Sequence, residues 1–435
     1  MRVRERFACL SLAAGLVLMA SLQAKPASRD IQQLFDGSRA FAHIEALVAL
    51  GPRIAGGPAE RAAALYIAGA MTSCGLDVEI QEFPQTFFED LGAALEVVGG
   101  PALSPLTMLY SPPGEFFGVE IVFCGLGHPQ DFDGIDVAGK IALMRRGEIT
   151  FASKIANAAA AGAAAGIVFN SVPGNMNATL YSMAAIPAVM ISLEDGAILT
   201  GLLDEGPVAV NLTIDVVWYP STSQNVIGTL QGLDPDEGIV YIGAHYDSVW
   251  HGPGANDDGT GIGAMLEAAR VLTRYGHQTK ATIKFCAFGA EEVGSVGSEY
   301  FVMTGEEEVV GRGLGMINLD MIGVGDTLNI GNIGWADSAL TDYTREKAAV
   351  MGIQDWAPWT AGTNSDHVYF EWMGVPVVFL YQSPDPYYHT AEDTPDKIDV
   401  AVFARNGRLA TAVLYDWAKN PPVLARQLAT ADVAE

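Results

Sequence analysis

The pattern of apolar and polar positions divides the chain into two differently built parts. Apolar residues recur with the period of a helix at 38–50 and 59–72, and residues 76–83 alternate apolar with polar side chains, as a half-solvated strand does. From about residue 105, short strand-like runs follow at 120–123, 140–144, 166–169 and 188–191, interrupted by an alanine-rich helix at 151–165. This change predicts a small domain at 105–218, inserted after an N-terminal segment at 25–104.

The second half of the chain, residues 219–435, alternates strands with helices. Short apolar, β-branched runs predict strands at 239–244, 281–288, 316–319, 327–330 and 376–381, and helical periodicity predicts helices at 261–275, 337–351 and 400–419. Such an alternation is typical of a largely parallel or mixed sheet between helix layers. We therefore expect an α/β fold in which the second half, together with the N-terminal segment, forms one large domain.

Polar side chains follow four of these strands at the point where each strand ends. They are His245, Asp247, Asp257 and Asp258 after the first, Glu291 and Glu292 after the second, Asp320 after the third, and Tyr387, Tyr388 and His389 after the last. Taken singly, an acidic pair more often marks the start of a solvated helix than a functional site, and an Asp after a strand is more often a turn or cap residue than a ligand. Because strand ends of one sheet are neighbours in space, we expect these groups to converge.

A convergence of two histidines with several carboxylates indicates a metal site. Crowded carboxylates repel one another and take up protons unless a cation neutralises them. Imidazole and carboxylate ligands suit Zn²⁺, which needs about four ligands and leaves a position open for water in catalytic sites. If one Asp bridges two ions about 3.5 to 4 Å apart, five protein ligands serve both ions and one carboxylate stays unbound as a base.

The charge of the chain excludes some partners. It contains 51 acidic and 24 basic residues, which gives a formal net charge of -27 at pH 7. Binding to phosphate groups requires clustered Lys and Arg, and the sequence has no such cluster, so we expect neither a nucleic-acid partner nor an anionic membrane surface. Hydrophobic residues make up 50% of the chain, enough for a sizeable core.

The N-terminus has the features of a secretory signal peptide. Arginines lie at positions 2, 4 and 6, an apolar run follows at 7–22, and small residues lead to Ala24. The run is shorter than the roughly 20 apolar residues that span a bilayer, which disfavours a retained membrane anchor. We expect cleavage of residues 1–24 and a secreted or periplasmic protein. Three cysteines would remain, and whether Cys74 and Cys124 pair is left open.

The strings around the polar clusters resemble a known enzyme family. GAHYDS, GPGANDDGTG, GAEEVGSVGSEYF, INLDMIG and PYYHTAEDT are closely similar to the motifs of the dizinc aminopeptidases of peptidase family M28. The resemblance extends from about residue 224 to the C-terminus and implies an α/β/α sandwich around a mixed, mostly parallel sheet. In the insert, GIDVAGKIALMRRGEITFASKIANAAAAGAAAGIVFNS and IPAVMIS resemble a protease-associated (PA) domain, which several M28 peptidases carry.

The resemblance implies a metal-binding role for five residues. His245 and Asp320 would hold one Zn²⁺, Glu292 and His389 would hold the other, and Asp257 would bridge the two ions.

Further residues receive roles from the same resemblance. Glu291 would act as general base, and Asp247 would orient the His245 imidazole. Tyr388 would stabilise the oxyanion, although Tyr387 and Tyr388 could both be packing aromatics. A non-proline cis peptide bond is expected between Asp257 and Asp258.

The reaction implied is the hydrolysis of N-terminal residues from peptides by a water activated between two zinc ions. The segments 245–261, 286–300 and 361–393 contain no Lys or Arg that could pair with a substrate's C-terminal carboxylate, so an acidic site suits a free N-terminus better. The alternatives are a glutamate-type carboxypeptidase or dipeptidase on the same fold, a glutaminyl cyclase with one zinc, and a receptor-like protein without catalysis. The preferred N-terminal residue and the oligomeric state are not readable.

Overall fold

The computed structural model describes residues 30–274 and 278–421, and its large domain is organised around strand β9 (Ile239–His245), which is buried along its whole length. Strands β10 (Thr282–Phe288) and β11 (Gly313–Leu319) run parallel to β9 on either side, and β14 (Val377–Ser383) runs parallel to β11. Strand β12 (Thr327–Asn332) is antiparallel to β14 and parallel to β13 (Trp356–Thr360) at the edge. The sheet is therefore mixed and mostly parallel, as predicted.

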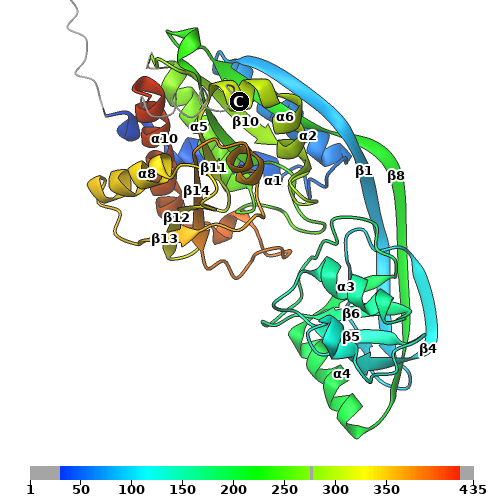
Figure 1. The fold of residues 1–435 in the computed structure, drawn as a ribbon. Coiled ribbons are helices and arrows are strands. Elements are labelled where there is room, and N and C mark those ends of the chain that lie inside the picture. Colours follow the sequence, from blue (N-terminus) through cyan, green and yellow to red (C-terminus); the bar gives the residue numbers. More distant parts are fainter. Residues whose placement is uncertain (1–29, 275–277, 422–435) are drawn as a thin grey trace, which may run out of the picture.

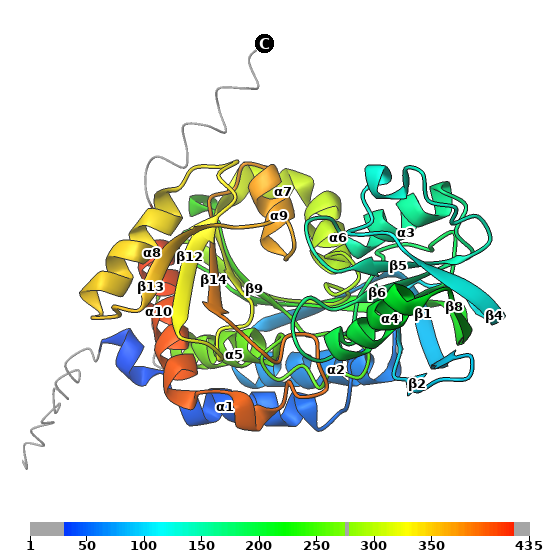
Figure 2. The same cartoon turned by 90° about the horizontal axis from the view of Figure 1, so that it is seen from below.

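Helices cover both faces of this sheet, as Figure 2 shows. One face is covered by α1 (Gly37–Val48), α2 (Pro58–Ser73), α5 (Gly259–Arg274), α8 (Ala339–Val350) and α10 (Val400–Lys419), and the other by α6 (Val296–Thr304), α7 (Glu306–Arg312) and α9 (His367–Trp372). Val240 and Ile242 pack in the first core, whereas Ile239 and Tyr241 pack in the second. Because β9 is buried on both faces, its sequence is a continuous apolar run.

Two long antiparallel strands, β1 (Asp77–Val97) and β8 (Val208–Leu230), connect the large domain with the insert (Figure 1). The strand expected at 76–83 is only the first part of β1. The prediction ended at Phe83, just before a proline, but the strand continues through Pro84, because β1 pairs there with β8 alone and a proline is tolerated at a sheet edge. No loop separates residues 218 and 219, where we expected the insert to end: β8 runs through this position, and one sheet extends across both parts.

The insert contains the four strands expected from the sequence. These are β4 (Gly114–Phe123), β5 (Ile141–Arg145), β6 (Ala165–Phe169) and β7 (Ala188–Ile191), each parallel to the next. Two short strands add to the sheet: β3 (Leu106–Thr107) pairs with β7, and β2 (Ala102–Leu103) pairs with β1. Helix α3 (Phe151–Ala160) ends five residues before the predicted 165, because Gly162 adopts φ 92° and stops it. Helix α4 (Leu193–Glu205) was not predicted.

Short elements account for most of the other differences. The sequence pattern did not reveal α6, α7, α9 or β13, which are too short to show a clear period. Single 3₁₀ turns lie at Ile31–Leu34, Pro129–Phe132, Pro235–Glu237 and Pro395–Lys397. Cys74, Cys124 and Cys286 are free thiols, so Cys74 and Cys124 do not pair. The expected signal peptide lies outside the described residues, and within them no helix has the length and apolar character to cross a bilayer.

The two-sided burial of β9 predicts the effect of a core truncation. Ile242 is fully buried, and we expect Ile242→Ala to lower the free energy of unfolding by about 2–5 kcal/mol, because a cavity is left in the central strand. Urea denaturation in zinc-free buffer, followed by tryptophan fluorescence, measures this. Val350→Ala is the matched control, since Val350 is 83% exposed, and should change stability by less than about 0.5 kcal/mol. Equal effects would contradict the assigned core.

Candidate metal centre

Asp257 lies between the two histidines of the predicted site. Its Oδ1 is 3.1 Å from His245 Nε2, and its Oδ2 is 3.3 Å from His389 Nε2. His245 is the last residue of β9, Asp257 lies in the loop that enters α5, and His389 lies in the loop after β14. One carboxylate oxygen therefore faces each imidazole, which is the arrangement that a bridging ligand requires.

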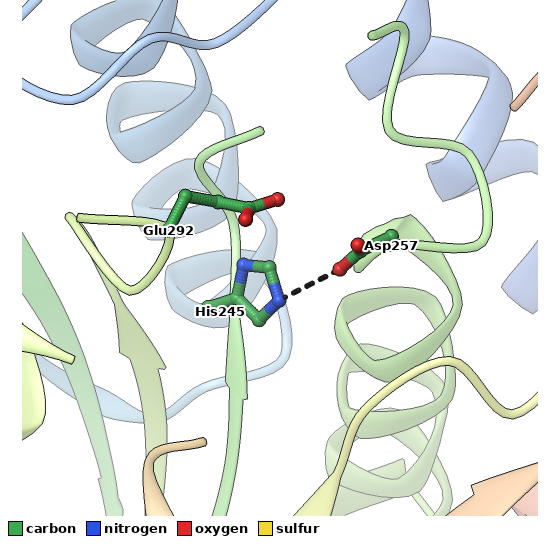
Figure 3. A group of neighbouring side chains, drawn as sticks. All are labelled: His245, Asp257 and Glu292. Atoms are coloured by element: carbon green, nitrogen blue, oxygen red, sulfur yellow. Dashed lines mark hydrogen bonds and ion pairs between the residues drawn. The ribbon is translucent and has the colours of Figure 1, made fainter. Parts of the chain in front are cut away.

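The other two predicted ligands lie on either side of this group. Glu292 Oε2 is 3.0 Å from His389 Nε2, and Asp320 Oδ1 is 3.7 Å from His245 Nε2. Figure 3 shows His245, Asp257 and Glu292 pointing toward one another from three different segments, and their ligand atoms all lie within 4.8 Å of one another. The structure thus brings together all five residues that the sequence proposed as ligands.

Asp258 also approaches the site, because its ligand atom and those of His245 and Asp320 all lie within 4.8 Å of one another. Its Oδ1, however, accepts hydrogen bonds from the backbone N–H groups of Gly261 at 2.7 Å and Met321 at 3.2 Å. Asp258 therefore has a structural role, because its carboxylate links the start of α5 to the segment after β11. The peptide bond between Asp257 and Asp258 is cis, as the family resemblance implied.

Asp247 joins the ends of two strands through a single buried carboxylate. Its oxygens accept the backbone N–H groups of Glu291 and Glu292 at 3.0 and 3.1 Å. One of these oxygens also lies 3.4 Å from His245 Nδ1, on the side of the ring opposite Asp257. Asp247 is fully buried, and its carboxylate ties the backbone of the acidic pair to the end of β9 beside the His245 ring.

The loop after β9 is held by a buried arginine. The guanidinium of Arg53 donates to the carbonyl oxygens of Tyr246 at 2.6 Å, Pro253 at 2.7 Å and Gly254 at 2.9 Å. A Cβ at Gly254 would lie 2.6 Å from Arg53 Nη2, and Gly254 has φ 66°, so this position requires glycine. The arginine thus closes the loop that carries Asp257.

Two further carboxylates that had no assigned role support the ligands. Asp393 accepts the backbone N–H groups of Asn256 at 2.8 Å and Asp257 at 3.1 Å. Glu60, in α2, accepts from the backbone N–H of Ala290 at 3.2 Å and from Ser223 Oγ at 2.6 Å, just before the acidic pair. Asp393 lies within the motif string PYYHTAEDT, but Glu60 resembles an ordinary acidic residue in the first turn of a helix, so no sequence signal distinguished it.

Two serines that had no assigned role also contact the site. Ser295 Oγ donates to Glu291 Oε1 at 3.2 Å, and Ser365 Oγ donates to Asp320 Oδ2 at 2.8 Å. Ser295 has φ 53°, Ala290 φ 56° and His389 φ 58°. Left-handed backbone is rare outside glycine and persists where the surroundings hold it, so the site contains stored conformational strain.

The chemistry of these donors fits Zn²⁺. Imidazole nitrogens and carboxylate oxygens are ligands that zinc accepts. Buried oxygens of Glu292 (Oε1) and Asp320 (Oδ1) lack a hydrogen-bond donor. Burial raises the pKa of Glu292 to about 7, with the Asp257 carboxylate adding to the rise. Burial alone would also raise the pKa of Asp257, but hydrogen bonds from His245 and His389 hold that pKa below its usual range. A bound cation would relieve this crowding.

The site opens into a cleft of about 740 Å³ between the large domain and the insert. Asp257, Glu291, Glu292, Asp320 and His389 line it, together with Trp359, Phe379 and Tyr381 of the large domain and Thr150, Thr179 and Tyr181 of the insert. None of the described residues that line it is a Lys or Arg. The acidic site therefore faces an aromatic wall, and the insert forms part of the cleft.

The adjacent residues Tyr387 and Tyr388 have different surroundings. Tyr388 lines the cleft, and its ring stacks on that of His389 with the centroids 3.8 Å apart. Burial raises the pKa of Tyr388 well above its usual range, and Asp257 adds to the rise, so its hydroxyl stays protonated. Tyr387 instead lies beneath the ammonium group of Lys397, 5.5 Å from its ring centroid.

Comparison with known proteins identifies the family. Aminopeptidase YwaD of Bacillus subtilis (strain 168) is 34% identical over 452 residues, which cover 96% of this chain and 95% of that protein. Residues 225–414 match the model of peptidase family M28, and residues 116–199 match that of the PA domain. This chain belongs to peptidase family M28. The resemblance seen in its sequence is thereby confirmed, including the PA domain within the insert.

Other members and solved structures agree with this assignment. A probable leucine aminopeptidase 2 of Aspergillus fumigatus is 33% identical over 345 residues, covering 76% of this M28 chain and 68% of its own length. An aminopeptidase from Aneurinibacillus sp. strain AM-1 superimposes with a TM-score of 0.75 at 33% identity, covering 91% and 97% of the two chains. A zinc aminopeptidase from Bacillus subtilis superimposes with a TM-score of 0.76 at 33% sequence identity, and the match covers 90% of this chain and 97% of that chain. The expected fold is confirmed, and these relatives belong to the expected enzyme class.

The crowded ligand set predicts that zinc stabilises the fold. Removing metal with a chelator should lower the Tm, and adding zinc at about 100 times its Kd should restore about 2.7 kcal/mol of stability, because the ion binds only the native site. Differential scanning calorimetry measures this shift. An Asp257→Asn variant should show a much smaller response, since the amide removes the charge between His245 and His389. A wild-type Tm that does not depend on zinc would contradict the metal site.

Proposed function

We propose that this M28 chain is a secreted aminopeptidase that binds two Zn²⁺ ions and releases N-terminal residues from peptides. His245 and Asp320 would hold one ion, Glu292 and His389 the other, and Asp257 both. The observation that carries the proposal is the position of Asp257, with one carboxylate oxygen toward each histidine at 3.1 and 3.3 Å. The names of the similar proteins, which are aminopeptidases, support the reaction class.

Glu291 is the proposed general base. When bound, zinc supplies Lewis-acid activation of the attacking water and of the scissile carbonyl. The Glu291 carboxylate lines the cleft, takes the proton of the water and passes it to the leaving amine. Burial raises the pKa of Glu291 well above its usual range, which favours holding this proton between the two steps. Ser295 and the backbone bond to Asp247 keep the carboxylate in place.

Two other groups complete the proposed mechanism. Asp247 holds His245 in the ring orientation that directs Nε2 toward Asp257. Tyr388 is the proposed oxyanion donor, because it lines the cleft next to His389 and keeps its proton.

The charge of the cleft supports binding of a free N-terminus. An ammonium group is attracted by the carboxylates, whereas a C-terminal carboxylate would need a cation that the described lining residues do not provide. Two basic side chains of the insert are engaged elsewhere: Lys154 donates to the carbonyls of Leu126 and Gly147, and Arg146 donates to Asn170. This disfavours a glutamate-type carboxypeptidase. The aromatic wall of Trp359, Phe379 and Tyr381 favours hydrophobic N-terminal side chains.

A test of the base is the Glu291→Gln variant. We expect kcat to fall at least about 100-fold, because the amide cannot accept the proton, while zinc content stays near that of the wild type. Activity on a leucine-headed chromogenic substrate and metal analysis of the same preparation measure both quantities. Glu299→Gln is a suitable control, since Glu299 lines the same cleft and has no proposed role. Near-normal turnover in Glu291→Gln would remove this residue from the mechanism.

The end of the peptide that is cleaved separates the candidate functions. Incubation of the zinc-loaded protein with an unblocked leucine-headed peptide should release the N-terminal residue, and N-acetylation should abolish the reaction, because the ammonium group is lost. Mass spectrometry identifies the shortened end. Loss of the C-terminal residue would instead support the carboxypeptidase alternative. Cyclisation of an N-terminal glutamine with one bound zinc would support the cyclase, and absence of metal would support a non-catalytic protein.

A further inference from the structure

A loop of the insert contacts the backbone of a proposed zinc ligand. Asn177 lies between β6 and β7, in the inserted part of the chain. Its backbone N–H and its side-chain Nδ2 both donate to the carbonyl oxygen of His389, at 3.0 and 3.1 Å. A single residue of the insert thus holds this carbonyl with two hydrogen bonds.

The backbone of His389 needs such support. The residue has φ 58°, a conformation that non-glycine residues adopt only where neighbouring groups maintain it. It also lies in the irregular segment after β14, and no strand hydrogen bonds hold it there. Its carbonyl faces the insert, whereas its ring faces Asp257 and Glu292. Fixing the carbonyl therefore restricts where Nε2 can lie.

Asn177 is itself fixed within the insert. It is 7% exposed, and the residues after it are tied to the chain next to β3: Leu109 donates to the carbonyl of Ala178 at 2.8 Å, and Leu180 donates to the carbonyl of Leu109 at 3.0 Å. Ala178 and Leu180 pack in one apolar cluster with Val293, the residue after Glu292. The loop is therefore a supported contact between the two parts of the chain.

Asn177 also shares a cavity with both ligands proposed for one ion. Asn177, Glu292 and His389 are among the residues that line it. We infer that Asn177 is a positioning residue, through which the insert sets the place of His389 and hence the affinity for the zinc ion shared by His389 and Glu292. This inference rests on the proposed function. It gives the PA-containing insert a role in building the metal site, in addition to lining the cleft.

The variant Asn177→Asp tests this inference. It keeps the size of the side chain but places a carboxylate oxygen where Nδ2 donates, so that it repels the carbonyl of His389. Outer partners of metal ligands typically contribute about 10–100-fold in affinity, and we expect the Kd of the zinc ion shared by His389 and Glu292 to rise by about that factor. Asn177→Ala, which removes one hydrogen bond without adding repulsion, should give a smaller rise. Competition with a chromophoric zinc chelator measures both.

The matched control is Asn157→Asp. Asn157 lies on α3, and its Nδ2 donates to the carbonyl of Gly127 at 2.9 Å, entirely inside the insert. This variant should bind zinc like the wild type. The Tm of the zinc-free proteins is the second readout: Asn177→Asp should lower it no more than Asn157→Asp does. A merely structural role for Asn177 would instead lower this Tm and leave zinc affinity unchanged.

The possible outcomes separate this inference from the proposed function. Wild-type zinc affinity in Asn177→Asp, or equal losses in Asn157→Asp, would overturn the positioning role. If Asn177→Asp does not fold, the comparison of Asn177→Ala with Asn157→Ala decides in the same way. A wild-type protein that binds zinc and cleaves no peptide would overturn the proposed function and leave the zinc test intact. A wild-type protein that binds no zinc would overturn both.

Discussion

Repulsion between buried carboxylates is the constraint on which this structure depends. Asp257, Asp258, Glu291, Glu292 and Asp320 are at most 9% exposed and lie at one edge of the sheet. Such groups stay together only if backbone N–H donors, imidazoles or a cation offset their charge. Backbone donors serve Asp258, and the two histidines serve Asp257. Buried oxygens of Asp258 (Oδ2), Glu292 (Oε1) and Asp320 (Oδ1) lack a hydrogen-bond donor, so a bound cation would offset charge that the protein itself leaves uncompensated.

The framework around these groups is correspondingly rigid. Asp247 accepts the backbone N–H groups of the acidic pair, Asp393 accepts that of Asp257, and Arg53 closes the loop between them through three carbonyls. These supporting groups are buried, so each hydrogen bond they make replaces water that would otherwise solvate a charge. The positions of metal-binding side chains depend on the groups that hydrogen-bond to them as much as on the ligands themselves.

The insert also helps to hold the proposed metal-binding residues and the cleft in place. The antiparallel pair β1 and β8 extends the sheet of the large domain into the insert (Figure 1). Tyr181 of the insert lines the cleft, and Asn177 donates to the carbonyl of His389. An apolar cluster that includes Met176 and Ala178 of the insert and Ala290 and Val293 of the large domain fills the space between them. Movement of the insert would therefore disturb both the cleft and the backbone of a proposed ligand.

The sequence by itself determined the central strands and the types of side chain that follow them. Strand β9 is apolar because it is buried on both faces, and the polar residues begin where it ends, so His245 and Asp257 could be placed at a sheet edge. Family motifs then assigned roles to the individual residues. Helix ends were less well predicted, as at α3, because one left-handed glycine outweighs an alanine-rich pattern.

Only the tertiary structure decided what supports the site. Asn177 and His389 are 212 positions apart, Glu60 and Ala290 are 230 apart, and Arg53 and Tyr246 are 193 apart. Locally, each of these residues looks ordinary: an Asn in a loop, a Glu in a first helical turn, an Arg after a turn. Their functions come from contacts across the sheet and between the two parts of the chain, and no local pattern of apolar and polar residues encodes contacts over such separations.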